Sequence, residues 1–175
     1  LYTNPNKHDK MDCKGIETVR RDFCILIQQM METVLNKLLI EKNLNSAIEY
    51  TKSKIKELLT NNIDMSLLVV TKSLGKTDYE TRLPHVELAK KLKQRDSATA
   101  PNVGDRVSYI IVKGVKGQAQ YERAEDPLYV LDNNLAIDYN HYLDAIKSPL
   151  SRIFEVIMQN SDSLFSGDHT RHKTI

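Results

Sequence analysis

The sequence contains little that would support a disulfide framework or a membrane span. Its 175 residues include only two cysteines and no tryptophan. Two cysteines are too few for a disulfide framework, so a reducing, intracellular compartment fits the chain. No apolar run approaches the roughly 20 residues that a membrane-spanning helix needs, and we therefore expect no membrane partner.

Catalytic and metal-binding motifs are also missing from the sequence. It has no GxSxG, HExxH or GxGxxG pattern. The glycine–lysine turn at residues 113–117 is too short and irregular for a phosphate-binding P-loop. His169 and His172 have HxxH spacing, but neither a cysteine nor a third ligand accompanies them, so the pattern does not favour a metal site. We expect no catalytic residue, no metal and no cofactor in this chain.

The composition is that of an ordinary globular protein, with 41% hydrophobic and 27% charged residues. This length supports one domain with its own core, or one lobe of a larger protein. The net charge is only +2. Any affinity for nucleic acid must therefore come from the placement of the charges rather than from their sum.

Two helices are predicted in the first third of the chain. Apolar residues recur at three- and four-residue steps from Ile16 to about Glu41, which indicates a long amphipathic helix with Cys24 as a small buried residue. A second helix is predicted from Asn45, because Ser46 and Glu49 match a capping box. Its lysines lie off the apolar stripe and are typical of a solvated face.

Shorter elements are expected in the last third. Leu128–Val130 is a short apolar run that could pair with an earlier strand, and the acidic pair before Pro127 indicates a turn. Asp138 is predicted to start a helix, and Pro149 to begin a last one.

The stretch from Pro84 to Ile111 organises the middle of the chain. It begins as a helix that is apolar on one side and rich in lysine and arginine elsewhere, and a break near Pro101 ends it. A turn then leads into Val107–Val112, a run rich in branched residues that predicts a strand. A basic helix beside a short strand could hold a polyanion, and the alternative is a lysine face that only contacts solvent. The expected fold class is α+β, mainly α, with a small antiparallel β element.

Several stretches resemble, in order and spacing, the DNA polymerase delta family of eukaryotic replicative polymerases, which belongs to the B family. The resemblance covers nearly the whole chain. The matching stretches are MDCKGIETVRRD (Met11–Asp22), IDMSLLVVTKSL (Ile63–Leu74), HVELAKKLKQRD (His85–Asp96), APNVGDRVSYII (Ala100–Ile111), AEDPLYVLDNN (Ala124–Asn134), IDYNHYL (Ile137–Leu143), PLSRIFEVI (Pro149–Ile157) and GDHTRHKT (Gly167–Thr174).

This resemblance implies that the chain is the thumb of a nuclear DNA-directed DNA polymerase. The parent is expected to use Mg²⁺ in its palm and zinc and iron–sulfur centres in C-terminal modules, all outside this chain. Implied partners are primer–template duplex DNA, the palm, fingers and exonuclease of the same subunit and, through the parent, accessory subunits and the sliding clamp. The matching motifs imply DNA contacts from Lys14, Arg20, Arg21, Lys72, His85, Lys90, Arg95, Arg106 and Tyr109.

Some of these residues have alternative interpretations. The arginines at 20 and 21 could pair locally with Glu17, and Tyr109 could be a core residue. The expected organisation is a linker from the palm (1–15), a thumb domain (16–160, divided into lobes 16–83 and 84–160) and a tail (161–175). The rival functions are a helical protein-interaction scaffold and a stand-alone nucleic-acid-binding module.

Overall fold

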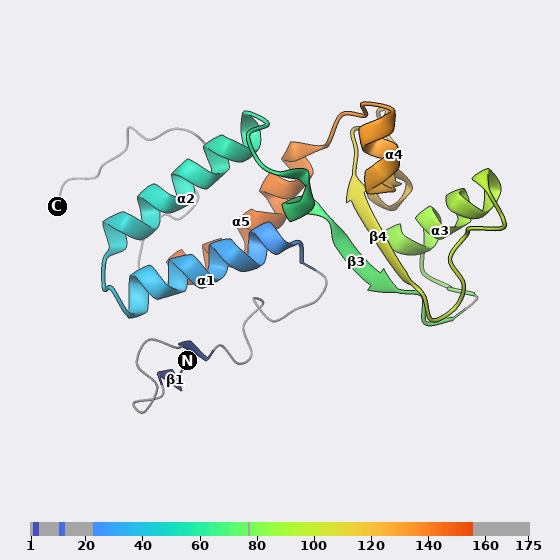
Figure 1. Cartoon of the computed structure of the whole chain (residues 1–175). Helices are drawn as coiled ribbons and strands as arrows, with labels where there is room; N and C mark the ends of the chain where they lie inside the picture. Colours follow the sequence, from blue (N-terminus) through green and yellow to red (C-terminus); the bar gives the residue numbers. More distant parts are fainter. Residues whose placement is uncertain (1, 4–10, 13–22, 77, 156–175) are drawn as a thin grey trace. The chain divides into compact units, whose positions relative to one another are not determined.

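The computed structural model describes residues 23–76 and 78–155, together with the backbone of two short strands. These strands, β1 (Tyr2–Thr3) and β2 (Met11–Asp12), pair antiparallel. The chain divides into two compact units (Figure 1). The first unit comprises the chain up to Asp64 and from Tyr139 onward, and the second comprises Met65–Asp138. The lobe boundary expected at residue 83 therefore falls inside the second unit.

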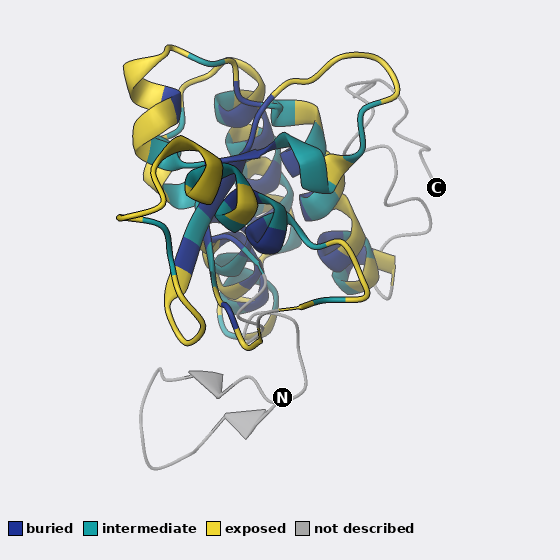
Figure 2. Cartoon of the chain, turned by 90° about the vertical axis from the view of Figure 1, so that its right-hand side faces the viewer, coloured by how far each residue is buried: buried dark blue, intermediate teal, exposed yellow. Residues whose placement is uncertain are grey.

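In its described residues, the first unit has three helices: α1 (Ile25–Leu39), α2 (Leu44–Leu59) and α5 (Tyr139–Glu155). Helix α1 packs on α2, and α5 contacts both. Each helix buries a stripe of side chains at helical spacing, which explains why these segments fold as helices (Figure 2). The stripe of α1 consists of Leu26, Ile27, Met30, Met31, Val34 and Leu35.

The starts of α1 and α2 differ from the prediction. Helix α1 begins at Ile25 because Cys24, its N-cap, has an extended backbone with ψ at 161°. Phe23 is not helical either, and residues 16–22 lie outside the described part. Helix α2 is capped by Asn43, whose side-chain oxygen accepts the Ser46 N–H at 3.0 Å. The predicted capping box was therefore wrong by one turn. Cys24 is buried, as predicted.

The predicted break at Pro149 was also wrong. Helix α5 runs from Tyr139 to Glu155, and Pro149 lies inside it. A proline removes one helical hydrogen bond, which would favour a break. Its neighbours Tyr142, Ile146, Leu150 and Phe154 form one continuous buried stripe, however. Burial of that stripe explains why the helix continues through the proline.

The second unit contains a three-stranded antiparallel sheet in the order β3 (Val70–Ser73), β4 (Arg106–Ile111), β5 (Ala124–Glu125). Val70 pairs with Tyr109, and Ile110 pairs with Glu125. Helix α3 (Pro84–Arg95) packs against β4, β5 and the 3-10 turn η3 (Gln120–Arg123). A further 3-10 turn, η2 (Met65–Leu68), precedes β3. The predicted fold class, α+β and mainly α, is confirmed.

The segment Leu128–Val130 is helical rather than a strand. It belongs to α4 (Pro127–Asp132), which contacts β4. The Asp126 carboxylate accepts the Tyr129 N–H at 3.0 Å and so caps this helix, and Pro127 occupies its first position. An aspartate followed by proline is a typical helix start, and this signal outweighed the apolar run that followed.

Candidate nucleic-acid interface

Helix α3 carries four cationic side chains, Lys90, Lys91, Lys93 and Arg95, at or near the candidate interface. Pro84 at the first turn needs no hydrogen-bond donor, and Lys93 and Arg95 in the last turn favour the negative end of the helix dipole. The helix ends at Asp96, whose carboxylate accepts the Ala98 N–H and the Thr99 hydroxyl. Val86 and Leu88 are buried, so the side of α3 toward the sheet is fixed by apolar packing.

An ion-pair cluster fixes α3 to β5. The Arg95 guanidinium donates to both oxygens of Glu125, at 3.0 Å from Nη1 and 2.8 Å from Nη2. The same guanidinium lies over the Tyr129 ring, 3.8 Å from its centroid. Lys91 Nζ donates to the carbonyls of Glu122 and Ala124 at 2.6 and 2.9 Å.

Glu125 is the buried centre of this cluster, with 7% of its surface exposed. Burial raises the pKa of the Glu125 carboxyl, but the hydrogen bonds from Arg95 and the charges of Lys91 and Arg95 outweigh burial and hold the pKa below its usual value. The acidic residue before Asp126 is thus a structural anchor and not only the turn residue expected from the sequence.

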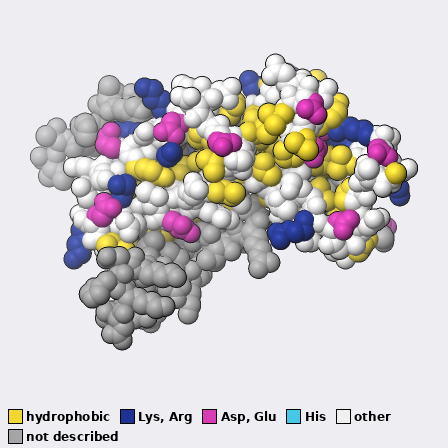
Figure 3. Space-filling view, in the orientation of Figure 1, with side chains coloured by type: hydrophobic (Ala, Val, Ile, Leu, Met, Phe, Trp, Pro, Cys, Tyr) yellow, Lys and Arg dark blue, Asp and Glu magenta, His cyan; other side chains and the backbone are white. Residues whose placement is uncertain are grey.

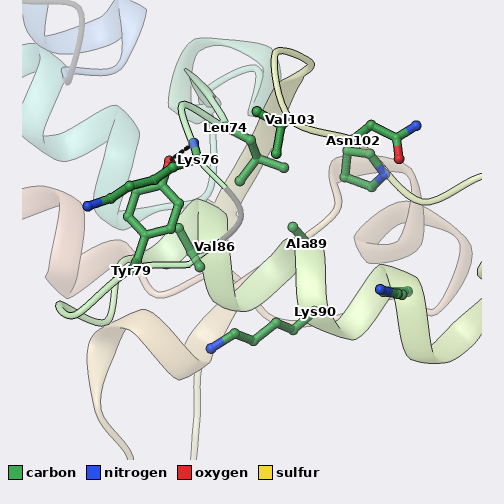
Figure 4. Close-up of a pocket in the computed structure, with 10 residues that line it drawn as sticks. Leu74, Lys76, Tyr79, Val86, Ala89, Lys90, Asn102 and Val103 are labelled. Atoms are coloured by element: carbon green, nitrogen blue, oxygen red, sulfur yellow. Dashed lines mark hydrogen bonds between the residues drawn. The ribbon is translucent and has the colours of Figure 1, made fainter.

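A groove lies along the exposed side of α3, with a volume of about 290 Å³. Its walls come from α3, from the segment after β3 and from the turn before β4. Leu74 and Val103 lie across from Val86 and Ala89, and Lys90 stands at the edge (Figure 4). The complete lining is Leu74, Lys76, Tyr79, Val86, Ala89, Lys90, Lys93, Pro101, Asn102 and Val103. It thus combines an apolar floor with three lysines and includes no acidic side chain.

Hydrogen bonds tie the two loop walls of this groove to each other. Gly104 N–H donates to the Leu74 carbonyl at 2.7 Å, and Leu74 N–H donates to the Asp105 carbonyl at 2.9 Å. Gly104 has φ at +94°, a backbone conformation that glycine adopts without strain. Within the first wall, the Tyr79 hydroxyl accepts the Gly75 N–H at 2.7 Å. Backbone hydrogen bonds therefore fix the two loop walls to each other.

The structure describes six of the nine predicted DNA contacts, and all six lie in the second unit. Lys90 and Arg106 are exposed. Lys90 pairs with Glu87 at 3.0 Å, whereas Arg106 stands at the start of β4 opposite Ser73. Arg95 is engaged by Glu125. The other three predicted contacts, Lys14, Arg20 and Arg21, lie outside the described residues.

The remaining predicted contacts are partly or fully buried. His85 is 4% exposed and Tyr109 is 6% exposed, so neither presents much surface to a ligand. Lys72, half-buried on β3, lies close enough to His85 for its charge to act on the imidazole. Burial first, and the charge of Lys72 second, lower the pKa of His85 below its usual value. Tyr109 fits the alternative of a core residue.

Sequence reasoning did not predict DNA contacts from four other exposed cations of the second unit. Lys76 and Lys93 line the groove, and Lys113 and Lys116 lie in the loop after β4. Within the described ranges, none of the four has a carboxylate partner. The exposure of the two loop lysines was visible in the sequence, because each directly precedes a glycine, a pattern typical of a turn. On the face drawn in Figure 3, lysines and arginines are interspersed with acidic side chains.

Residues 23–76 and 78–155 contain neither a metal-binding cluster nor a membrane-spanning helix. Within these ranges, no three His, Cys, Asp or Glu side chains gather closely enough to hold a metal ion. No helix in the same ranges has the length and apolar character required to cross a membrane. The HxxH pair of the sequence lies outside the described residues.

Comparison with known proteins gives one consistent family. The sequence profile of DNA polymerase family B matches residues 1–157. The chain is 54% identical over 171 residues to the DNA polymerase delta catalytic subunit of Dictyostelium discoideum, which covers 97% of this chain and 16% of that protein. It is 54% identical to the corresponding subunit of Arabidopsis thaliana, covering 100% of this chain and 16% of that protein.

A solved structure shows the same family. The family B DNA polymerase of the hyperthermophilic archaeon Pyrobaculum calidifontis superimposes with a TM-score of 0.66 at 26% sequence identity. The superposition covers 78% of this chain and 18% of that one. This chain thus spans about a sixth of the length of its curated relatives.

Proposed function

The chain belongs to DNA polymerase family B, and on that premise we propose that it is the thumb of a replicative polymerase. In this role it holds the primer–template duplex from the minor-groove side, without regard to sequence. The names of its relatives and the small share of their length that it spans both support a part of a larger polymerase subunit.

The observation that carries this proposal is a set of exposed cations in the second unit that lack carboxylate partners in the described part of the chain. They are Lys76, Lys93, Arg106, Lys113 and Lys116. An unpaired lysine or arginine can neutralise one phosphate and release its counterion. Phosphate contacts position a protein on DNA but carry no sequence information, which suits a polymerase that must accept every correct base pair.

The individual predicted contacts take different roles in this proposal. We keep Lys90 and Arg106 as DNA contacts, because both are exposed. We assign His85, Arg95 and Tyr109 to the scaffold that positions the exposed cations. His85 and Tyr109 are buried, and Arg95 already donates to Glu125.

The other four predicted contacts are either half-buried or outside the described residues. We also propose that Lys72 acts at the edge of the interface, since it is half-buried. Lys14, Arg20 and Arg21 lie outside the described residues, and their contacts with DNA stay predictions.

We extend the proposal to the parent protein through its relatives. Because these are catalytic subunits of DNA polymerase delta, we propose that the parent transfers nucleotidyl groups in the nucleus, with Mg²⁺ held in its palm. The zinc and iron–sulfur centres, the accessory subunits and the sliding clamp would engage parts of the parent outside this chain. We propose that this segment binds the primer–template duplex and supplies no metal ligand.

Fluorescence anisotropy with duplexes of equal length and different sequence tests this function. We expect the dissociation constants to agree within about two-fold, because phosphates are common to all sequences. A minor-groove-binding drug should compete with the protein, whereas a protein that holds only the outer backbone should be indifferent to it. A helical protein-interaction scaffold would bind none of the duplexes, and a sequence-reading module would prefer one of them by more than ten-fold.

A further inference from the structure

The groove on α3 has an apolar floor that a duplex backbone does not need. Leu74 and Val86 are buried in it, while Val103 at its mouth is 51% exposed. Phosphates are strongly hydrated and gain nothing from such a floor. An apolar concavity favours a ligand that has a flat or apolar part of its own.

The size of the groove limits that ligand to one small group. Pockets for drug-sized molecules begin at about 300 Å³, and this groove holds about 290 Å³. A single nucleobase is within that range, whereas a stacked base pair is not. Because backbone hydrogen bonds join its two loop walls, the groove can receive such a group without rearrangement.

The charge of the groove selects an anion. Of its three lysines, Lys90 is already paired with Glu87 at 3.0 Å. Lys76 and Lys93 have no carboxylate partner in residues 23–76 and 78–155. Lys76 Nζ lies 5.3 Å from the centre of the Tyr79 ring, so a cation and an aromatic face stand together at the same wall.

A polar group also borders the floor. The Asn102 backbone N–H donates to the Asp105 carboxylate at 2.8 Å, and Asn102 is one of the residues that line the groove (Figure 4). An amide can donate to or accept from any base edge. Lysines beside an aromatic ring are the groups that bind unpaired nucleotides with little sequence preference. In this groove an apolar floor and an amide lie next to them.

We propose that this groove binds one unpaired nucleotide, with its base on the floor of Leu74 and Val86 and against Val103 at the mouth, and its flanking phosphates on Lys76 and Lys93. The proposal rests on the proposed function and deepens it. Duplex would be held by exposed cations, while a single-stranded segment would place one base in the groove. The same thumb could thus hold a strand that has left the duplex.

Anisotropy with single strands tests this proposal on the whole 175-residue chain. The two probes are an oligothymidylate of about eight nucleotides and an abasic oligonucleotide of the same length, which has the phosphates but no bases. We expect the oligothymidylate to bind at least about five-fold more tightly, because contact of one base with the apolar floor and the Tyr79 ring should contribute about the low end of the range for base–aromatic stacking. The blunt duplex is measured in parallel.

Two matched variants locate the effect. Val103→Glu places a carboxylate in the mouth of the groove, whereas Val115→Glu places the same charge on a residue that is 78% exposed and outside it. We expect Val103→Glu to weaken oligothymidylate binding at least about five-fold and to abolish the preference over the abasic strand. Val115→Glu should keep the preference. Circular dichroism melts of both variants test whether they remain folded.

Each other outcome overturns the proposal in a distinguishable way. Equal affinity for the two strands, with duplex binding intact, means that no base enters the groove, while the proposed thumb function stands. Loss of the preference over the abasic strand in both glutamate variants means that the added charge and not the groove determines it. Absence of binding to every probe contradicts the nucleotide site and the duplex grip together.

Discussion

Arg95 and Glu125, 30 residues apart in the chain, form a two-point ion pair that joins α3 to β5. The carboxylate is buried, and its oxygens lie 2.8 and 3.0 Å from the guanidinium nitrogens. The Tyr129 ring covers the same guanidinium. The orientation of the basic helix, and with it the groove, therefore depends on this pair.

Arg95→Ala should destabilise the second unit. It leaves the buried Glu125 carboxylate with Lys91 as its only remaining ion-pair partner among the described residues. Loss of one partner of a buried polar group costs about 1–3 kcal/mol in free energy of unfolding. Urea denaturation measures this. Lys93→Ala, on the same helix and without a carboxylate partner, is the control and should change stability by less than about 0.5 kcal/mol. Equal effects of the two variants would contradict the anchoring role of Arg95.

His85 should make stability depend on pH in the mildly acidic range. Burial and then the charge of Lys72 lower the pKa of His85 in the folded chain below its usual 6.5. As the pH falls through 6.5, the unfolded chain therefore binds a proton that the folded chain does not, and stability is lost. Urea denaturation from about pH 7.5 to about pH 5.5 measures this loss.

The His85→Gln variant provides the control for that pH dependence. A glutamine side chain does not titrate, so the variant should lose less stability than the unsubstituted chain over the same pH range. If the two chains lose stability in parallel, His85 is not the titrating group. Lys72→Met should move the imidazole titration toward higher pH in NMR spectra, because one nearby positive charge is removed.

Gly104→Ala should also lower stability, through the backbone. Gly104 has φ at +94°, where a residue with a Cβ is strained, although no atom lies within 4 Å of the added methyl group. We expect a loss of at least about 1 kcal/mol in free energy of unfolding by urea denaturation. Gly75→Ala is the matched control, because its added Cβ would meet only the Tyr79 hydroxyl at an ordinary 3.6 Å. A larger loss of stability in Gly75→Ala than in Gly104→Ala would contradict the assignment of the strain to Gly104.

The sequence predicted the features that depend on local periodicity. The apolar stripes of α1 and α2 were visible, because residues three and four apart share one face of a helix. Pro84 marked the start of α3 correctly. The run Val107–Val112 was visible as a strand because it is rich in branched residues, and β4 contains most of it.

Features that depend on distant partners were not predictable. The pairing of Arg95 with Glu125 joins two segments that no local pattern connects, so the arginine looked like a solvent-facing cation. Burial of His85 and Tyr109 depends on the packing of α3 and β4, which only the tertiary structure shows. The groove depends on the bond between Gly104 and Leu74, which also lie 30 residues apart. For these reasons, Lys76 and Lys93 appear as its cations only in the folded chain.

The most direct test of the thumb assignment is the salt dependence of duplex binding. The logarithm of the duplex association constant is measured against the logarithm of the salt concentration for the unsubstituted chain and for the triple variant Lys93→Ala/Arg106→Ala/Lys113→Ala. The control is Lys56→Ala, which changes an exposed lysine of the first unit. If these three cations contact phosphates, the slope should fall in magnitude by about 0.9 for each, or about 2.7 in all. The control should leave it unchanged. An unchanged slope in the triple variant would contradict the account, because the unpaired cations of the second unit would then not hold DNA.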